Sequence, residues 1–294
     1  MSTPIYYPHG IVLPGGLNPI TQIEGLPLEF NFQEYSLRSA SAVRPGLTGS
    51  HGWDPLVQQS TTQIADVLDA CVLDNIAAGL TGNIDCEWRL ATNLLGRIPL
   101  ATAQHIRTRA QLALLTWESI SAQNQQLANI DFRLQFIADG GNPALITENN
   151  VALQAPAAVR HAYTLGPATL TTSSVNETLC AQGVRFDNRN TFKTVYCNGT
   201  GDVEYSSIDT SDPMLTIDVE DVSRALALVN NRGEAITAFT WYLRKKELGG
   251  VNIPNATAEH IKFTATVGTA KPMNPRQIGV LVHNFAVDTA AAIV

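Results

Sequence analysis

The chain has 294 residues, of which 45% are hydrophobic and 15% are charged, and its formal net charge is −7. These proportions are typical of a globular protein, and the length favours about two domains of roughly 150 residues each. The acidic balance argues against a surface that grips nucleic acid, because phosphate binding needs clustered Lys and Arg.

No segment predicts export or membrane insertion. The first residues lack a basic region followed by an apolar one, and no apolar run approaches the length that spans a bilayer. We therefore expect synthesis in a cytoplasm and no contact with a membrane. The cysteines have neither CxxC spacing nor a nearby His, so buried reduced thiols are expected rather than a zinc site. They are Cys71, Cys86, Cys180 and Cys197.

The first half of the chain predicts one amphipathic helix among strands. Apolar residues recur at helical spacing over residues 62–77, and Ser60 with Gln63 has the spacing of a capping box. The connector at residues 92–104 is long for a hairpin, and such loops are usually functional or disordered. Strands are expected at residues 85–90, 105–114 and 129–137.

The second half repeats this order of elements. Residues 219–230 have helical spacing, with Asp218 placed to cap the helix. A second long connector follows at residues 247–259. Strands are expected at residues 181–186, 191–197, 214–219, 235–244, 260–267 and 278–286, where β-branched, aromatic or alternating residues gather.

A direct repeat links the two halves. Residues 101–107 read Ala-Thr-Ala-Gln-His-Ile-Arg, and residues 256–262 read Ala-Thr-Ala-Glu-His-Ile-Lys, an offset of 155. The same offset places Arg89 on Arg244 without a gap, and a shift of about three residues aligns the upstream segments. The sequence thus predicts a mainly β fold of two tandem β-sandwich or barrel modules, each with one packed helix. The modules are expected at residues 1–150 and 160–294, with a linker at 151–159.

Two histidines invite a catalytic interpretation. His105 and His260 occupy equivalent positions in the repeat, yet neither has a nucleophile or a second His at metal spacing. The sequence also contains no GxSxG elbow, phosphate-cradling glycine loop or HExxH motif. We expect each His to begin a strand and to hydrogen-bond the adjoining loop. The chain is therefore expected to be no enzyme and to need no cofactor or metal.

The order of elements resembles the tail tube proteins of long-tailed bacteriophages. Each half runs strand, Asp-Pro turn, strand, single helix, strand, long loop, strand, strand, and residues 163–170, 209–213 and 255–261 are similar to segments of phage tail proteins. The resemblance implies subunits that form rings with a continuous β-barrel as the inner wall. It also implies that rings stack through long loops and chain termini, and that three two-module chains close a pseudo-sixfold ring.

The function implied by this resemblance is that of a virion structural protein, a tail tube subunit that polymerises into a DNA-conducting channel. Its place is the virion tail, and its partners are other copies of itself, other tail proteins and DNA that passes without specific binding. The net charge of −7 is consistent with this, because like charge suppresses adhesion. The alternatives are a tail-tip, tail-completion or capsid-associated protein, or a carbohydrate-binding β-sandwich.

Chain–chain contacts are expected at the two long connectors and at the last strand. Weakly charged connectors of this length should be ordered by a partner, and residues 278–286 contain no charge or proline. An open edge of that composition is an aggregation hazard, so neighbouring sheets are expected to join edge to edge. The expected contact residues are Leu94, Leu95, Arg97, Leu248, Gly249, Gly250, Asn252, Asn255, Val280, Val282 and Ile293.

Overall fold

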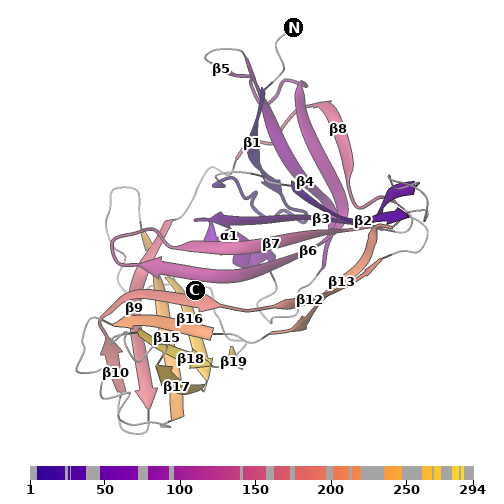
Figure 1. The fold of residues 1–294 in the computed structure, drawn as a ribbon. Helices are drawn as coiled ribbons and strands as arrows, with labels where there is room; N and C mark the ends of the chain where they lie inside the picture. The colour runs from indigo at the N-terminus through magenta and orange to yellow at the C-terminus, as the bar shows by residue number, and fades with distance from the viewer. Residues whose placement is uncertain are drawn as a thin grey trace.

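The computed structural model shows a mainly β protein. In the part of the chain that it describes, strands form one 17-stranded sheet and a separate two-stranded sheet, with a single helix. The large sheet curls into a half-barrel (Figure 1). The described residues are 5–23, 26, 28–37, 47–71, 79–92, 96–139, 142–156, 162–172, 176–196, 201–211, 214–219, 235–246, 260–266, 268–272, 280–284 and 286–287.

The first half pairs six strands, all antiparallel, in the order β1, β4, β6, β7, β3, β2, and β8 pairs with the first part of β6. The strands expected at residues 85–90, 105–114 and 129–137 are confirmed within β4, β6 and β7. The elements are β1 (Ile5–Val12), β2 (Leu28–Leu37), β3 (Leu47–Thr61), α1 (Ile64–Ala70), β4 (Gly79–Thr92), β5 (Gly96–Arg97), β6 (His105–Gln123), β7 (Asn129–Ile137) and β8 (Ile146–Val151).

The second half pairs its strands in the corresponding order β9, β15, β16 with β17, β18, β14, β11. Strands are confirmed in all six segments where the sequence predicted them. The elements are β9 (Ala162–Thr172), β10 (Asn176–Leu179), β11 (Ala181–Asp187), β12 (Thr191–Tyr196), β13 (Val203–Thr210), β14 (Met214–Val219), β15 (Ala235–Lys246), β16 (His260–Thr266), β17 (Gly268–Pro272), β18 (Val280–Asn284) and β19 (Ala286–Val287).

The register of the central strands is the same in both halves. Trp88 of β4 lies opposite Ile106 of β6. Leu243 of β15 lies opposite Ile261 of β16. These two residue numbers exceed those of Trp88 and Ile106 by 155, which is the offset of the sequence repeat. This agreement continues in the same direction along both strand pairs. The repeat in the sequence therefore coincides with a repeat in the strand pairing.

The outer hairpins also agree in register, with an offset of 158. Leu28 of β2 lies opposite Val57 of β3, and Phe186 of β11 lies opposite Leu215 of β14. Farther along this hairpin, β2 and β3 remain paired. In the second half, β12 and β13 pair in the same register, again at the offset of 158. The long β2–β3 hairpin of the first half thus corresponds to β11, β12, β13 and β14 of the second.

Both halves carry a bulge at the same place. In β1, residues 9–10 lie opposite the single residue Glu87 of β4, and in β9, residues 166–167 lie opposite Tyr242 of β15. Tyr242 is the counterpart of Glu87 at the offset of 155. At Gly166 a Cβ atom would lie 2.4 Å from the carbonyl oxygen of Tyr242, so the close approach requires glycine.

The helix α1 is shorter than the sequence predicts and begins differently. It ends at Ala70, because Cys71 has extended backbone angles. The expected capping box is wrong: Ser60 belongs to β3, and Gln63 occupies the N-cap position without a side-chain cap. The Gln63 side chain instead holds the segment before β2, as described below. The expected second helix lies outside the described residues from residue 220 onward.

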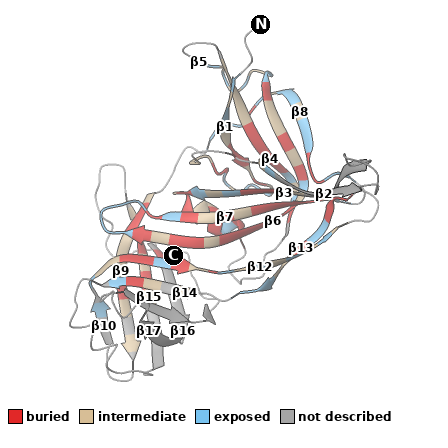
Figure 2. Ribbon diagram, viewed as in Figure 1, coloured by how far each residue is buried: buried red, intermediate tan, exposed pale blue. Residues whose placement is uncertain are grey.

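The buried core is centred on β6 and β7 (Figure 2). Phe132 and Phe136 of β7 are fully buried, as the alternation in that strand predicted, and α1 packs its apolar side on these strands. The same core includes Phe186 and Trp241 of the second half. In the described part of the segment expected to be a linker, Leu153 is buried and its amide donates to the carbonyl of Leu100 at 2.8 Å.

The strand β18 is not an open edge. Its residues pair with β14 on one side, and the central three also pair with β17 on the other. The expectation that an exposed edge at residues 278–286 drives assembly is therefore wrong for the described residues 280–284. An apolar strand of this kind is suited to the middle of a sheet, where both edges are paired.

Candidate assembly interface

The strands β6 and β11 pair with each other and so join the two halves of the chain. Beyond the end of its pairing with β4 at Leu114, β6 continues and pairs with β11, from Ser119 opposite Asp187 to Gln123 opposite Gly183. We call this contact the seam. It joins the sheet of one half edge to edge with the sheet of the other. Backbone hydrogen bonding of this kind is a recurrent way for β proteins to associate.

Aromatic and amide side chains reinforce the seam. The rings of Trp117 and Phe186 lie 5.1 Å apart between centroids, and both side chains are buried. Asn188 follows directly, and its amide nitrogen donates to the carbonyl of Trp117 at 3.1 Å while its backbone N–H donates to the carbonyl of Glu118 at 2.8 Å. At the other end, the backbone N–H of Asn124 donates to the carbonyl of Gln182 at 2.7 Å.

Beyond the seam, β12 and β13 pair to form an arm (Figure 1), and β13 contacts β7 and β3. Phe192 and Tyr196 of the arm pack against a small apolar cluster that contains Leu114 and Ile137 of the first half. The Arg133 guanidinium lies 4.2 Å above the Phe192 ring, a cation–π contact. The arm thus extends the contact from the strand edge to the sheet face.

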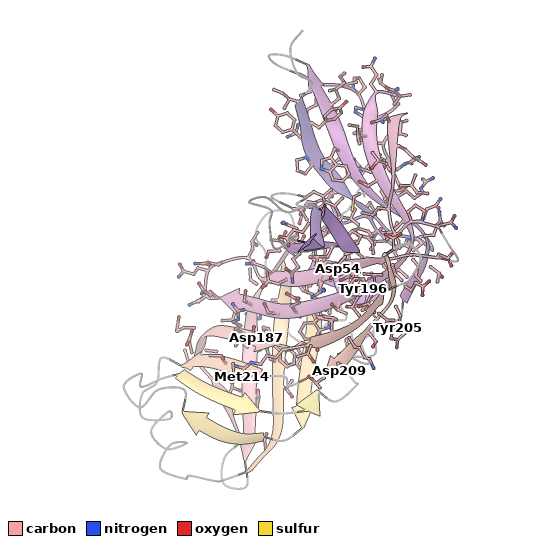
Figure 3. All side chains as sticks on the ribbon, turned by 45° about the vertical axis from the view of Figure 1, so that its right-hand side comes forward. Asp54, Asp187, Tyr196, Tyr205, Asp209 and Met214 are labelled. Carbon is pink, nitrogen blue, oxygen red and sulfur yellow. The ribbon has the colours of Figure 1, made fainter. Side chains whose placement is uncertain are left out.

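A polar network fixes the strand beneath the arm. Gln135 is fully buried, and its amide nitrogen donates to a carboxylate oxygen of Asp54 and to the carbonyl of Pro55. Its amide oxygen accepts from Arg133 at 2.8 Å. Asp54 lies beside Tyr196 of the arm (Figure 3). Burial, followed by the negative charge of Asp54, raises the pKa of Tyr196 above its ordinary value.

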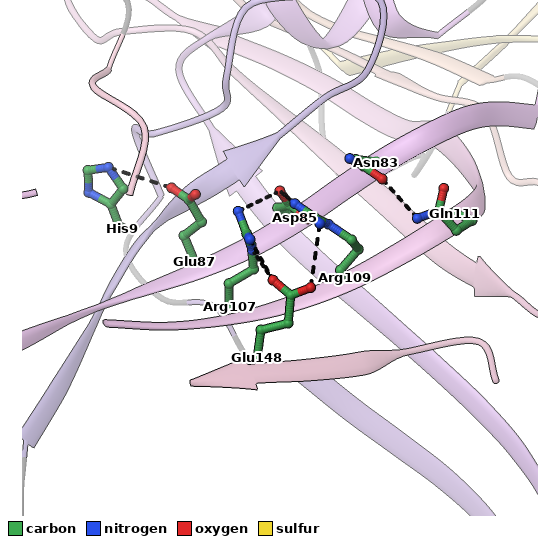
Figure 4. Close-up of polar contacts among 8 residues, drawn as sticks. All are labelled: His9, Asn83, Asp85, Glu87, Arg107, Arg109, Gln111 and Glu148. Carbon is green, nitrogen blue, oxygen red and sulfur yellow. Dashed lines mark hydrogen bonds and ion pairs between the residues drawn. The ribbon is translucent and has the colours of Figure 1, made fainter. Parts of the chain in front are cut away.

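The main charged cluster of the described residues lies on β4, β6 and β8 (Figure 4). Asp85 is buried and accepts from Arg109 through both oxygens, at 2.7 and 2.9 Å. Arg107 donates to Glu148 at 2.8 Å, so two arginines and two carboxylates alternate across the three strands. The counterparts of Asp85 and Arg109 are Thr240 and Thr264, so the second half does not repeat this cluster.

Glu87 extends the cluster toward β1. Its carboxylate is buried, one oxygen has no hydrogen-bond partner, and the ring nitrogen Nε2 of His9 is 3.9 Å away. Burial raises the pKa of Glu87 to about 7, a hydrogen bond from the Gln154 backbone opposes the rise, and Asp85 adds to it. Glu87 therefore lies at the β1 end of the charged network.

His105 has the structural role that the sequence predicted. It begins β6 and is fully buried. Its Nδ1 accepts from the backbone N–H of Leu90 at 3.0 Å, and its Nε2 lies 3.0 Å from the carbonyl oxygen of Pro99 in the adjoining loop. His260 likewise begins β16, opposite Arg244, and it is the counterpart of His105 at the offset of 155.

The structure describes three of the predicted contact residues. Arg97, in β5, is exposed, and its guanidinium lies 5.8 Å from the Tyr7 ring centroid. Val280 and Val282 pair with Asp218 and Thr216 inside the chain. The others lie outside the described residues: Leu94, Leu95, Leu248, Gly249, Gly250, Asn252, Asn255 and Ile293. None of the three described residues lies on the seam between β6 and β11.

The cysteines are only partly as expected. Cys71 and Cys86 are buried free thiols, and burial raises the pKa of both. The expectation is wrong for Cys180, which is exposed, and Cys197 lies outside the described residues. Within the described ranges, no three His, Cys, Asp or Glu side chains gather in a way that could hold a metal. The described helix has seven residues, too few to cross a membrane.

In comparisons with known proteins, no protein-family model matches the chain, and no curated protein matches it.

Proposed function

We propose that this chain is a tail tube subunit of a long-tailed bacteriophage, a structural protein of the virion tail that polymerises into stacked rings around a DNA channel. It consists of two tandem tail-tube-like modules and performs no catalysis. It is made in the host cytoplasm and assembles there with other copies and other tail proteins. DNA passes through the lumen without specific binding.

The observation that carries this proposal is the seam between two halves with the same strand order and register. The seam joins the edge of β11 to a different surface, the continuation of β6, so it is a heterologous contact. Such contacts generate rings when the rotation closes. A chain that joins two like modules in this way already contains one step of a ring, and three chains would supply six modules.

Two further features support the proposal. The large sheet curls into a half-barrel, which is the shape required of a segment of a ring wall (Figure 1). The net charge of −7 suits a channel for DNA, because negative walls repel the phosphate backbone. The charged cluster of Asp85, Arg107, Arg109 and Glu148 is internally paired, so it stabilises the sheet without offering an anion site.

The test combines sedimentation velocity over a concentration series with negative-stain electron microscopy of the purified full chain. The proposal predicts large particles that appear as long hollow tubes. Discrete rings that never lengthen would instead favour a tail-tip, tail-completion or capsid-associated protein. A stable monomer at every concentration would contradict both, and glycan binding by that monomer would favour a carbohydrate-binding β-sandwich.

A further inference from the structure

The chain leaves β8 toward the second half through residues 152–156, which form neither a strand nor a helix. We call these residues the strap. Leu153 is its buried residue, and its N–H donates to the carbonyl of Leu100 at 2.8 Å. The other four residues of the strap are exposed. The strap therefore lies against the first half with water on its outer side.

Two side chains from different strands hold the backbone of Gln154 in the strap. The ring nitrogen Nε2 of His9 in β1 donates to the carbonyl oxygen of Gln154 at 2.8 Å. The carboxylate of Glu87 in β4 accepts from the backbone N–H of the same residue. The Nε2 atom of His9 also lies 3.9 Å from Oε2 of Glu87 (Figure 4). Gln154 is thus held at both of its backbone polar groups.

Glu87 is buried beside the strap with an incomplete set of hydrogen bonds. It is 2% exposed, and its Oε2 has no hydrogen-bond partner among the described residues. An ionised carboxylate in this position lacks the water that would hydrate its second oxygen, whereas the protonated acid carries no charge to hydrate. Lifting Gln154 away from Glu87 admits that water. Ionisation of Glu87 therefore favours an open strap, and protonation favours a closed one.

The charged groups around Glu87 do not neutralise it. Arg107 and Arg109 donate to Glu148 and Asp85, so neither arginine is bonded to Glu87. Burial has the largest effect on the pKa of Glu87, and it raises that pKa. Besides His9, the titratable and charged groups on this face of the sheet are Tyr7 of β1, Asp85 and Arg89 of β4, His105, Arg107 and Arg109 of β6, and Glu148 of β8.

The second half has neither the carboxylate nor the imidazole at the equivalent positions. Tyr242 is the counterpart of Glu87, and Gly166 is the counterpart of His9 in the equivalent bulge. The bulge is common to both halves, but the first half alone uses it to present an imidazole to the strap. The pair of His9 and Glu87 is therefore not required by the bulge itself.

We propose that His9 and Glu87 form a proton-controlled latch, which holds the strap closed while Glu87 is protonated and releases it when Glu87 ionises. This inference goes beyond the proposed function and does not depend on it. The closed strap binds the Glu87 proton more tightly, since the pKa of Glu87 is about 7 there, against an ordinary value of 4.5. Opening is therefore rarest below about pH 4.5, and it increases as pH rises to about 7.

Hydrogen exchange of the full chain tests the latch at the amides of Leu153 and Gln154. After correction for the intrinsic effect of pH on exchange, the strap should open more often at pH 8 than at pH 5, by about tenfold or more. In Glu87→Gln, which keeps the shape of the side chain but cannot ionise, this difference should disappear. In His9→Gln, which keeps an Nε2 donor that does not titrate, the difference should remain. Circular dichroism verifies that each variant is folded.

Urea distinguishes opening of the strap from unfolding of the whole chain. A local opening exposes little surface, so low concentrations of urea should leave exchange at Leu153 unchanged. The amides of β7 are the reference, because this strand is paired with β3 and β6 on its two sides. Their exchange should accelerate with urea, since they are released only by more extensive unfolding.

Several outcomes overturn the latch. One is equal corrected exchange of the strap at pH 5 and pH 8 in the parent chain. Another is a pH difference that persists in Glu87→Gln or disappears in His9→Gln, because Glu87 would then not be the group that controls the strap. A third is exchange at Leu153 that follows urea as steeply as exchange in β7. If Glu87→Gln does not fold, the parent chain and His9→Gln decide the outcome.

Discussion

At the scale of single residues, two buried polar side chains have opposite energetic effects. Glu87 is buried with one oxygen unsatisfied, so the ionised form is unfavourable in the folded protein. Gln63 is equally buried, but its amide makes five hydrogen bonds to the groups around it. Glu87 therefore reduces the stability of the fold at neutral pH, whereas Gln63 holds the segment before β2 against α1.

The variant Glu87→Gln should be more stable than the parent at neutral pH. The pKa of Glu87 is about 7 in the folded chain, against an ordinary value of 4.5. The folded state therefore holds the proton more tightly, and the contribution of Glu87 to stability is full below about 4.5 and lost as pH rises to about 7. The gain from Gln should be near zero at pH 4 and roughly 3 kcal/mol above pH 7, measured by urea unfolding.

Glu148→Gln is the control, because its effect on stability at neutral pH should be opposite to that of Glu87→Gln. The hydrogen bond from Arg107 lowers the pKa of Glu148, so its ionised form stabilises the fold above its ordinary pKa, and that stability is lost as pH falls. This variant should lose stability at neutral pH and approach the parent in acid. An identical pH profile for both Gln variants would contradict the account of the cluster.

The variant Gln63→Ala should lower the free energy of unfolding by roughly 2–4 kcal/mol. Its Oε1 accepts from the backbone N–H groups of Thr21 and Gln22 at 2.5 and 2.7 Å, and both donors lose that partner in the variant. Thermal and urea unfolding measure the loss. Gln58→Ala, at an exposed position, should stay within about 0.5 kcal/mol of the parent. Equal effects of the two substitutions would refute this role.

At the scale of secondary-structure elements, alternation made the strands predictable. Ile130, Phe132, Leu134 and Phe136 gave β7 its bounds, because one face of that strand is buried. The length of β3, by contrast, was not predictable, since its first part mixes glycine, polar and aromatic residues without alternation. The predicted helix was too long, because apolar residues continue at helical spacing past Ala70. The backbone is already extended at Cys71.

The contacts that build the candidate interface could not be read from the sequence. Phe186 carries no local sign that it packs on Trp117, because that contact depends on which strands meet edge to edge. The pairing of Arg107 with Glu148 likewise depends on the register of β6 and β8. Local pattern determines which residues form strands, whereas long-range register determines which side chains meet.

The arm supplies a prediction at this scale. Phe192→Ala should release the arm from β6 and β7, because it removes the ring that Arg133 covers and that packs near Leu114. The expected loss is about 1–3 kcal/mol in the free energy of unfolding, with faster proteolysis of residues 191–210. Tyr205→Ala, on the same arm and 54% exposed, should change neither. Unchanged cleavage of Phe192→Ala would contradict the docking.

At the scale of the whole molecule, the two halves share a pattern of strand pairing, which is the basis of the proposed assembly. Strand order, register and a bulge recur in both halves, and the seam joins them through unlike surfaces. The charged cluster breaks the symmetry, since Glu87 has Tyr242 as its counterpart. The two halves therefore share strand order, register and the bulge. The charged cluster on β4, β6 and β8 stabilises the first half alone.

The most direct measurement is a cryo-electron microscopy reconstruction of the assembled full-length chain. The account predicts a hollow tube whose layers each contain six similar modules from three chains, with the β6–β11 seam inside each chain. A particle in which chains meet through a two-fold contact of identical surfaces, or one without a central channel, would contradict it.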